Sequence, residues 1–265
     1  GKKDDGVKSL NKVNSKIELN ILNDPFDFNK IKNNNLNLFN IENISKIKYK
    51  NLLNQISIAN IICNKSGIDL VTMSIDKSIF KKKIKFNGMT EYLSEINKRD
   101  TIMLLKGDKF SVVPLTTHIN LKDITNIIDN KKLKKVISLL LKEVKKEHYK
   151  LNLNIYKFLC YNPHCSENRT LGEEDNIIKK SLNSFKEING PISADSAFSK
   201  ISKKTLFIST YHDQVLIPFK ALNSKMINMT LGLRYRRLSP AHGTAKDIKF
   251  KNISNVSSYI ECMKI

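Results

Sequence analysis

Three histidines stand where short apolar segments end, and their side chains could together hold a divalent cation. His118 comes after residues 111–115, His164 after 153–160, and His212 after 206–209. Because the carboxyl ends of parallel strands meet at one edge of a sheet, we expect the three imidazoles to lie near one another. Neutral imidazoles suit zinc and other borderline divalent ions, so the spacing predicts a three-histidine metal site with a position open for substrate.

Each histidine taken alone has a simpler interpretation, which is a side chain that caps a loop or forms a local hydrogen bond. The metal interpretation depends on the matching positions of all three. Two carboxylates add to it, Asp213 beside His212 and Asp195 in the loop 191–198, since either could orient an imidazole.

A second polar group follows His212 along the chain. Lys220, Asn228 and Arg237 supply two cations and an amide, which suit a phosphorylated or carboxylated substrate. Each of the three could equally be an ordinary surface residue. The Gly-rich patterns GxGxxG and GxxxxGK[ST] do not occur, so the usual nucleotide-phosphate motifs are absent from the sequence.

The elements that must position these residues alternate between strands and helices. Apolar positions at helical spacing predict a helix over 49–64, one that opens near residue 172, and helices between 121 and 144. Short apolar runs predict strands at 17–22, 68–74, 111–115, 153–160 and 206–209. This alternation is typical of an α/β fold with mainly parallel sheets.

Composition limits the classes of function. The 265 residues carry a formal net charge of +21, which is typical of nucleic-acid-binding proteins. The lysines are spread along the whole chain without interleaved aromatics, so we interpret them as solvated surface and expect no nucleic-acid partner. No apolar run approaches the roughly 20 residues that a bilayer needs, and the four cysteines lack metal or disulfide spacing, which favours the cytoplasm and no membrane contact.

A series of short motifs runs in a fixed order along the chain. They are Leu-Val-Thr at 70–72, Gly-Met-Thr-Glu at 88–91, Thr-Thr-His at 116–118, Asn-Pro-His at 162–164, Gly-Pro at 190–191, Tyr-His-Asp-Gln at 211–214, Asn-Met-Thr-Leu-Gly-Leu at 228–233 and Ser-Pro-Ala-His-Gly-Thr-Ala at 239–245. The ordered set resembles the 4-hydroxythreonine-4-phosphate dehydrogenase family of pyridoxal phosphate biosynthesis.

The resemblance implies a two-domain fold like that of isocitrate and isopropylmalate dehydrogenases. One domain would comprise residues 1–83 and 243–265, and the other, residues 84–242, would carry the metal and substrate residues. The family's proteins are homodimers whose active site is shared between subunits. Their reaction oxidises the C3 hydroxyl of a small phosphorylated substrate with NAD or NADP and a divalent metal (zinc, magnesium, manganese or cobalt), and carbon dioxide is then lost.

The resemblance also assigns roles to individual residues. It places His118, His164 and His212 at the metal, with Asp213 beside them among the catalytic residues. The implied substrate-binding residues are Thr90, Lys220, Asn228 and Arg237, and the implied cofactor-binding residues are His242, Gly243, Thr244 and Ala245.

Two departures from the family pattern leave alternatives open. The family's Gly-rich start is not found in this chain, and Met89 stands where the family has a histidine that contacts substrate. One alternative is therefore a related dehydrogenase of a phosphorylated sugar acid such as 4-phosphothreonate or 4-phosphoerythronate. Another is a homologue that keeps the fold and the dimer interface without catalysis.

Overall fold

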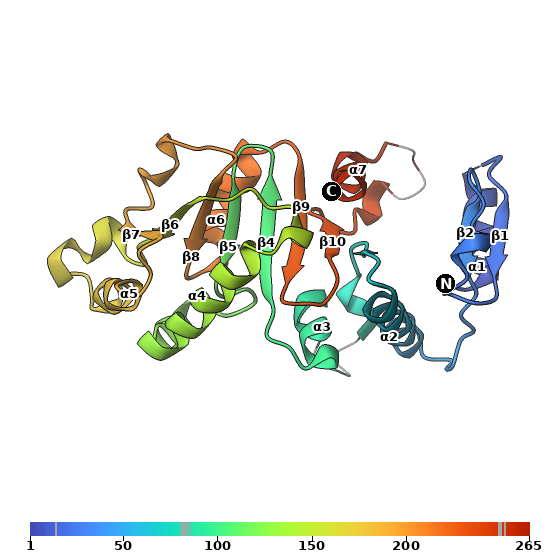
Figure 1. Cartoon of the computed structure of the whole chain (residues 1–265), viewed down its shortest axis with the longest axis horizontal. Helices are drawn as coiled ribbons and strands as arrows, with labels where there is room; N and C mark the ends of the chain where they lie inside the picture. Colours follow the sequence, from blue (N-terminus) through green and yellow to red (C-terminus); the bar gives the residue numbers. More distant parts are fainter. Residues whose placement is uncertain (14, 81–83, 85, 249–250, 252) are drawn as a thin grey trace. The chain divides into compact units, whose positions relative to one another are not determined.

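The computed structural model describes residues 1–265 apart from 14, 81–83, 85, 249–250 and 252 (Figure 1). Two compact units are formed, one by residues 1–70, 74–86 and 243–255 and the other by residues 71–73, 87–242 and 256–265. Residue 83, where the sequence analysis ends its first domain, lies outside the described residues. Residues 256–265 belong to the larger unit, unlike in the sequence-based division, because Cys262 is buried in that unit's core.

The described part of the smaller unit contains two α-helices, short 3₁₀ helices and a two-stranded sheet. Its elements are α1 (Lys3–Lys12), β1 (Leu19–Leu22), β2 (Leu36–Phe39) and α2 (Lys48–Ser66). The two strands pair in parallel. Helix α2 ends at Gly67, whose φ of 72° allows its N–H to bond the carbonyl of Cys63 at 2.9 Å.

An eight-stranded mixed sheet forms the centre of the larger unit. Its strands lie in the order β3 (Leu70–Val71), β10 (Arg237–Pro240), β9 (Met226–Leu231), β4 (Ile102–Gly107), β5 (Ser111–Pro114), β8 (Thr205–Ser209), β6 (Ile155–Leu159) and β7 (Ile188–Ile192). Strands β9, β5, β8, β6 and β7 run in one direction, and β4 and β10 run against them. The ends of β5, β8 and β6 therefore share one edge.

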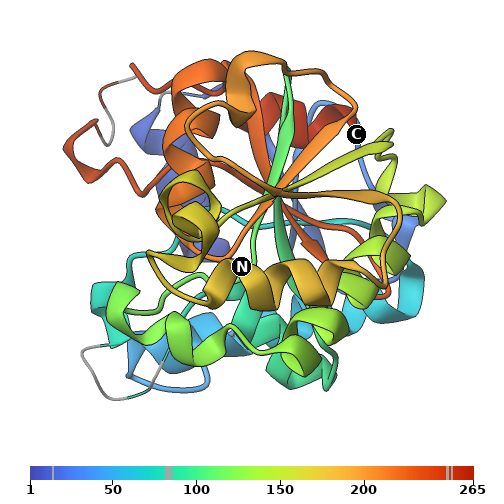
Figure 2. The same cartoon turned by 90° about the vertical axis from the view of Figure 1, so that its left-hand side faces the viewer.

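Helices cover both faces of this sheet (Figure 2). They are α3 (Met89–Asn97), α4 (Asn130–Val144), α5 (Glu174–Leu182), α6 (His212–Leu222) and α7 (Ser257–Lys264). Val113 and Ile208 pack in the core that contains residues of α4 and α5, whereas their neighbours Val112 and Phe207 pack with α6. Since alternate residues of a strand face opposite sides, burial on both faces explains why these strands read as unbroken apolar runs.

The connection after β9 is tightly packed. Gly232 has a φ of 102°, and a Cβ there would lie 2.3 Å from the carbonyl oxygen of Asp100. Its buried N–H donates to the hydroxyl of Tyr149 at 2.8 Å. Tyr149, in the short 3₁₀ helix Glu147–Tyr149 after α4, thus ties the helical layer to the end of β9.

No helix in the described part of the chain is both long and apolar enough to cross a membrane.

Tyr149→Phe removes the oxygen that accepts the Gly232 N–H. A buried donor without a partner is costly, so we expect the free energy of unfolding to fall by about 1–3 kcal/mol. Urea denaturation followed by circular dichroism measures the change. Tyr259→Phe, on an exposed position of α7, is the matched control, and an equal loss in that variant would contradict the role of the buried hydroxyl.

Candidate functional site

Two of the three histidines meet at the shared edge of β5 and β8. His118 lies four residues after β5 ends, and His212 begins α6 directly after the β8 connection. Their ring centroids are 6.5 Å apart. Because β5 and β8 are parallel neighbours, the two loops leave the sheet side by side.

A carboxylate lies beside each of these imidazoles, and the one beside His212 is within hydrogen-bond distance. Asp213 Oδ1 lies 2.7 Å from Nδ1 of His212, and Glu91 Oε1 lies 3.7 Å from Nδ1 of His118. A carboxylate on Nδ1 fixes the orientation of an imidazole and presents Nε2 to a cation. The nitrogen donors and their carboxylate partners therefore suit a divalent metal of the zinc type.

His164 lies in a separate hollow. It lines a cavity of about 250 Å³ together with Asn162, Asp195, Tyr211 and Gln214. The hydrogen bond from Ser193 lowers the pKa of the Asp195 carboxyl, and the nearby His164 imidazole adds to this effect. In the described part of the chain, no group of three or more His, Cys, Asp or Glu side chains is arranged to hold a metal ion. One chain thus brings together His118 and His212 but not His164.

The loop that carries His164 is anchored by a buried carboxylate. Asp175, in the first turn of α5, accepts from the N–H groups of Tyr161 and Asn162 at 2.6 and 3.0 Å, and from the Ser166 hydroxyl at 2.8 Å. Residues 164–169 all have positive φ, a conformation that costs about 1–2 kcal/mol per residue for L-amino acids. Asp175 therefore holds a strained loop in place.

Arg237 is a buried cation whose hydrogen bonds to described residues all go to hydroxyl groups. Its side chain donates to Thr72 Oγ1 from Nε at 3.0 Å and from Nη2 at 2.6 Å, and to Thr230 Oγ1 at 3.3 Å. Burial lowers the pKa of the guanidinium to about 10, so the group stays protonated at neutral pH. No carboxylate among the described residues forms an ion pair with it. Glu91 acts on this charge without forming an ion pair with it, so the buried guanidinium still favours an anionic ligand.

Helix α3 joins the arginine to the histidines. Thr90 shares a hydrogen bond with Thr230 at 3.1 Å, while Glu91, the next residue, accepts from the Thr117 hydroxyl at 2.8 Å beside His118. Gly88 lies against this group: a Cβ there would lie 2.6 Å from a carboxylate oxygen of Glu91, so a larger residue would displace the Glu91 side chain. Thr90, Glu91 and Thr117 also line a cavity of about 390 Å³.

Asn228 lies on the same face of the sheet as the arginine cluster. It is two residues from Thr230 on β9, so the two side chains point the same way. Its Oδ1 atom is buried and has no hydrogen-bond partner within the described residues. A buried acceptor without a donor is consistent with contact to a bound molecule.

The other predicted site residues lie apart from this group. Lys220 is exposed in the last turn of α6, which runs back along the sheet from His212, so the two lie about 12 Å apart along the helix axis. His242, Gly243, Thr244 and Ala245 are exposed after β10. Sequence reasoning missed the contacts of Thr72, Thr230, Glu91 and Asp175, although Thr72 ends the Leu-Val-Thr motif and Glu91 ends the Gly-Met-Thr-Glu motif.

Comparisons with known proteins bear on these residues. The family model "Pyridoxal phosphate biosynthetic protein PdxA" matches residues 6–265. A 4-hydroxythreonine-4-phosphate dehydrogenase of Hydrogenobaculum is 41% identical over 192 residues, which are 71% of this chain and 61% of that protein. The enzyme of that name from Aquifex aeolicus is 38% identical over 204 residues, 74% of this chain and 63% of the other. The matched part of the chain spans less than two thirds of these relatives.

A crystal structure of 4-hydroxythreonine-4-phosphate dehydrogenase from Klebsiella pneumoniae resembles this fold. The TM-score is 0.76 at 22% identity, over 97% of this chain and 86% of the other. The α/β class and the isocitrate/isopropylmalate dehydrogenase-like fold predicted from the sequence are thereby confirmed.

Asp175→Asn tests the anchor of the His164 loop. In the variant, an amide NH₂ group would replace one carboxylate oxygen that now accepts a hydrogen bond. We therefore expect the free energy of unfolding to fall by about 1–3 kcal/mol. We also expect the amides of residues 161–168 to lose protection from hydrogen exchange. Glu173→Gln, at an exposed position beside the same helix, should change stability by less than about 0.5 kcal/mol. Unchanged exchange at residues 161–168 would contradict this anchoring role.

Proposed function

This chain belongs to the PdxA family of pyridoxal phosphate biosynthetic proteins, and we propose that it is a 4-hydroxythreonine-4-phosphate dehydrogenase. The reaction would oxidise the C3 hydroxyl of 4-hydroxythreonine 4-phosphate with NAD or NADP. Loss of carbon dioxide would then give 3-amino-2-oxopropyl phosphate. The main support for this proposal is the buried Arg237, which forms no ion pair with a carboxylate among the described residues and is linked through Thr90 and Glu91 to the His118–His212 pair.

Arg237 would bind an acidic group of the substrate. A guanidinium presents a planar set of donors that matches a phosphate or carboxylate, and burial strengthens such a contact. Thr90 and the unpartnered Oδ1 of Asn228 lie on the same side and would contact polar groups of the same molecule. Lys220 would be a further cation that binds the substrate, although it does not lie near Arg237 within one chain.

His118 and His212 would hold the divalent metal, with Asp213 and Glu91 orienting their rings. A bound divalent cation supplies Lewis-acid stabilisation for the charge that develops on the substrate oxygen. Asp213 keeps the His212 imidazole in one tautomer through the bond at Nδ1.

A homodimer would complete this site. One chain brings two imidazoles together and leaves His164 in its own hollow, so the third ligand would be His164 of the partner subunit. The loop 242–245 would contact the adenosine part of the cofactor. The four cysteines are free thiols, which supports a location in the reducing cytoplasm.

Turnover tests the proposal directly. We expect 4-hydroxythreonine 4-phosphate, with NAD or NADP and added zinc, magnesium, manganese or cobalt, to produce the reduced cofactor, measured at 340 nm. Faster turnover of 4-phosphothreonate or 4-phosphoerythronate would instead favour the sugar-acid dehydrogenase, which is the alternative suggested by Met89. No reduced cofactor from any substrate would support the homologue without catalysis.

His212→Ala should remove the metal. With one imidazole of the pair lost, bound metal measured by mass spectrometry of the purified protein should fall by at least about tenfold. His148→Ala, in the short helix before β6, should leave the metal content unchanged. Metal retained in His212→Ala would exclude His212 as a ligand, whatever the activity.

Arg237→Lys keeps the charge and loses the planar donor set. We expect KM for the phosphorylated substrate to rise about 10- to 100-fold, with a smaller fall in kcat. Steady-state kinetics measures both constants, and thermal unfolding verifies the fold. Arg236→Lys, at the neighbouring position, should alter KM by less than about twofold; an equal rise in both variants would argue against a specific role for Arg237.

A further inference from the structure

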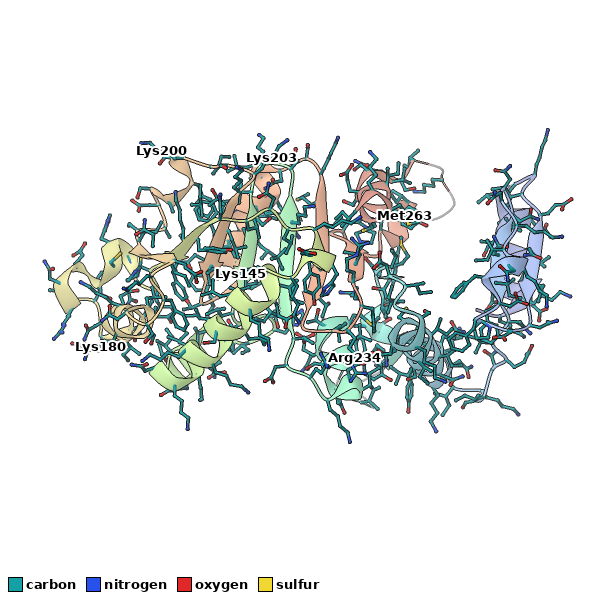
Figure 3. All side chains as sticks on the ribbon, in the orientation of Figure 1. Lys145, Lys180, Lys200, Lys203, Arg234 and Met263 are labelled. Carbon is teal, nitrogen blue, oxygen red and sulfur yellow. The ribbon has the colours of Figure 1, made fainter. Side chains whose placement is uncertain are left out.

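A hollow rich in lysines lies at the end of the sheet opposite to the histidines. It has a volume of about 520 Å³, and five of its lining residues are Lys106, Lys150, Lys203, Lys204 and Lys225. Lys203 and Lys204 come just before β8, and Lys225 comes just before β9. Lys106 lies near the end of the antiparallel β4. These four lysines are therefore at the edge of the sheet where β5 and β8 begin. Lys203 marks this edge at the top of the sheet in Figure 3. We call this hollow the lysine groove.

The two carboxylates that line the lysine groove are already engaged. Asp108 accepts from the N–H and the hydroxyl of Ser224 at 2.9 and 2.8 Å and from the N–H of Lys225 at 3.1 Å. Glu261 pairs with Lys264 at 3.3 Å. Five lysines against these two acids leave a formal charge of 5 − 2 = +3 around the hollow. Lys150 Nζ donates to the main-chain oxygen of Ile265 at 2.9 Å, and Glu261 acts on Lys106 without forming an ion pair with it.

Some lysines elsewhere in the same unit pair with acids. Lys135 pairs with Asp100 at 2.8 Å, Lys146 with Glu143 at 2.7 Å, and Lys145 with Glu187. In the lysine groove, by contrast, the ammonium groups of residues 106, 203, 204 and 225 have no carboxylate within ion-pair distance among the described residues. The lysine groove therefore differs from other basic surface in that several ammonium groups line one hollow.

Lys106 is the inner member of this set. It is half-buried, and loss of solvation lowers the pKa of its ammonium group. A cation kept partly out of water gains most from an anion that enters beside it. The apolar side chains of Leu151, Leu153 and Ile227 line the same hollow and would contact the uncharged part of such a ligand.

We propose that the lysine groove is a second anion site, which binds a small phosphorylated compound at a distance from the histidines. The strands between the two ends have four to six residues, so about 13–20 Å separates the sites. Nucleic acid fits this hollow less well, because its lining contains no aromatic side chain on which a base could stack. A phosphate compound with about two to three negative charges would match the positive charge of the lysine groove.

Titration calorimetry of the full chain with inorganic pyrophosphate, at about 50 mM salt, tests this site without turnover. We expect binding that Lys203→Ala combined with Lys204→Ala weakens at least about tenfold. Lys106→Met, which keeps the apolar stem, should weaken it similarly. The matched control combines Lys131→Ala with Lys142→Ala on exposed positions of α4, and it should change the affinity by less than about twofold.

Arg237→Gln separates this site from the proposed substrate site. Binding to the lysine groove should persist in that variant, whether or not the chain proves to be a dehydrogenase. The proposal is overturned if pyrophosphate does not bind the unmodified chain up to about 1 mM, if both lysine pairs weaken it equally, or if Arg237→Gln alone abolishes it. Tighter binding of duplex or single-stranded nucleic acid through Lys203 and Lys204 would also overturn it.

Discussion

The buried guanidinium of Arg237 is the interaction on which the arrangement of the candidate site depends. Two threonine hydroxyls, from Thr72 after β3 and Thr230 in β9, hold it within the sheet, and Thr90 of α3 bonds to the second of them. Hydroxyls satisfy the hydrogen bonds of a cation without neutralising it. The fold therefore keeps a positive charge out of water, and the free-energy cost of removing its solvation falls on this one residue.

That charge also explains why α3 lies where it does. Its first turn presents Thr90 to the arginine cluster and Glu91 to the loop that carries His118. A single helical turn thus sets the spacing between the group that would bind an acid and the pair of imidazoles. Gly88 leaves the Glu91 carboxylate in this position, because a side chain at residue 88 would push it aside.

Much of this arrangement was predictable from the sequence, for a physical reason. Parallel strands buried on both faces read as short apolar runs, so the ends of β5, β8 and β6, and the histidines after them, could be located. Strands β4, β9 and β10 were not predicted as such. In β9 and β10 the polar residues Asn228, Thr230, Arg237 and Ser239 interrupt the apolar run that marks a buried strand. Contacts such as Thr72 with Arg237 could not be inferred, because spacing within one element says nothing about which elements become neighbours.

The position of β9 between β10 and β4 has a consequence for how the molecule is made. Strand β4 pairs with β5 locally, but its other edge is covered only by a segment more than a hundred residues later in the chain. During synthesis on the ribosome, β4 therefore stays an open edge until residues 226–231 emerge, and such edges invite pairing with other chains. Arg237, which completes the cluster, emerges later still, so the edge of β4 has to avoid pairing with other chains while more than a hundred further residues are synthesised.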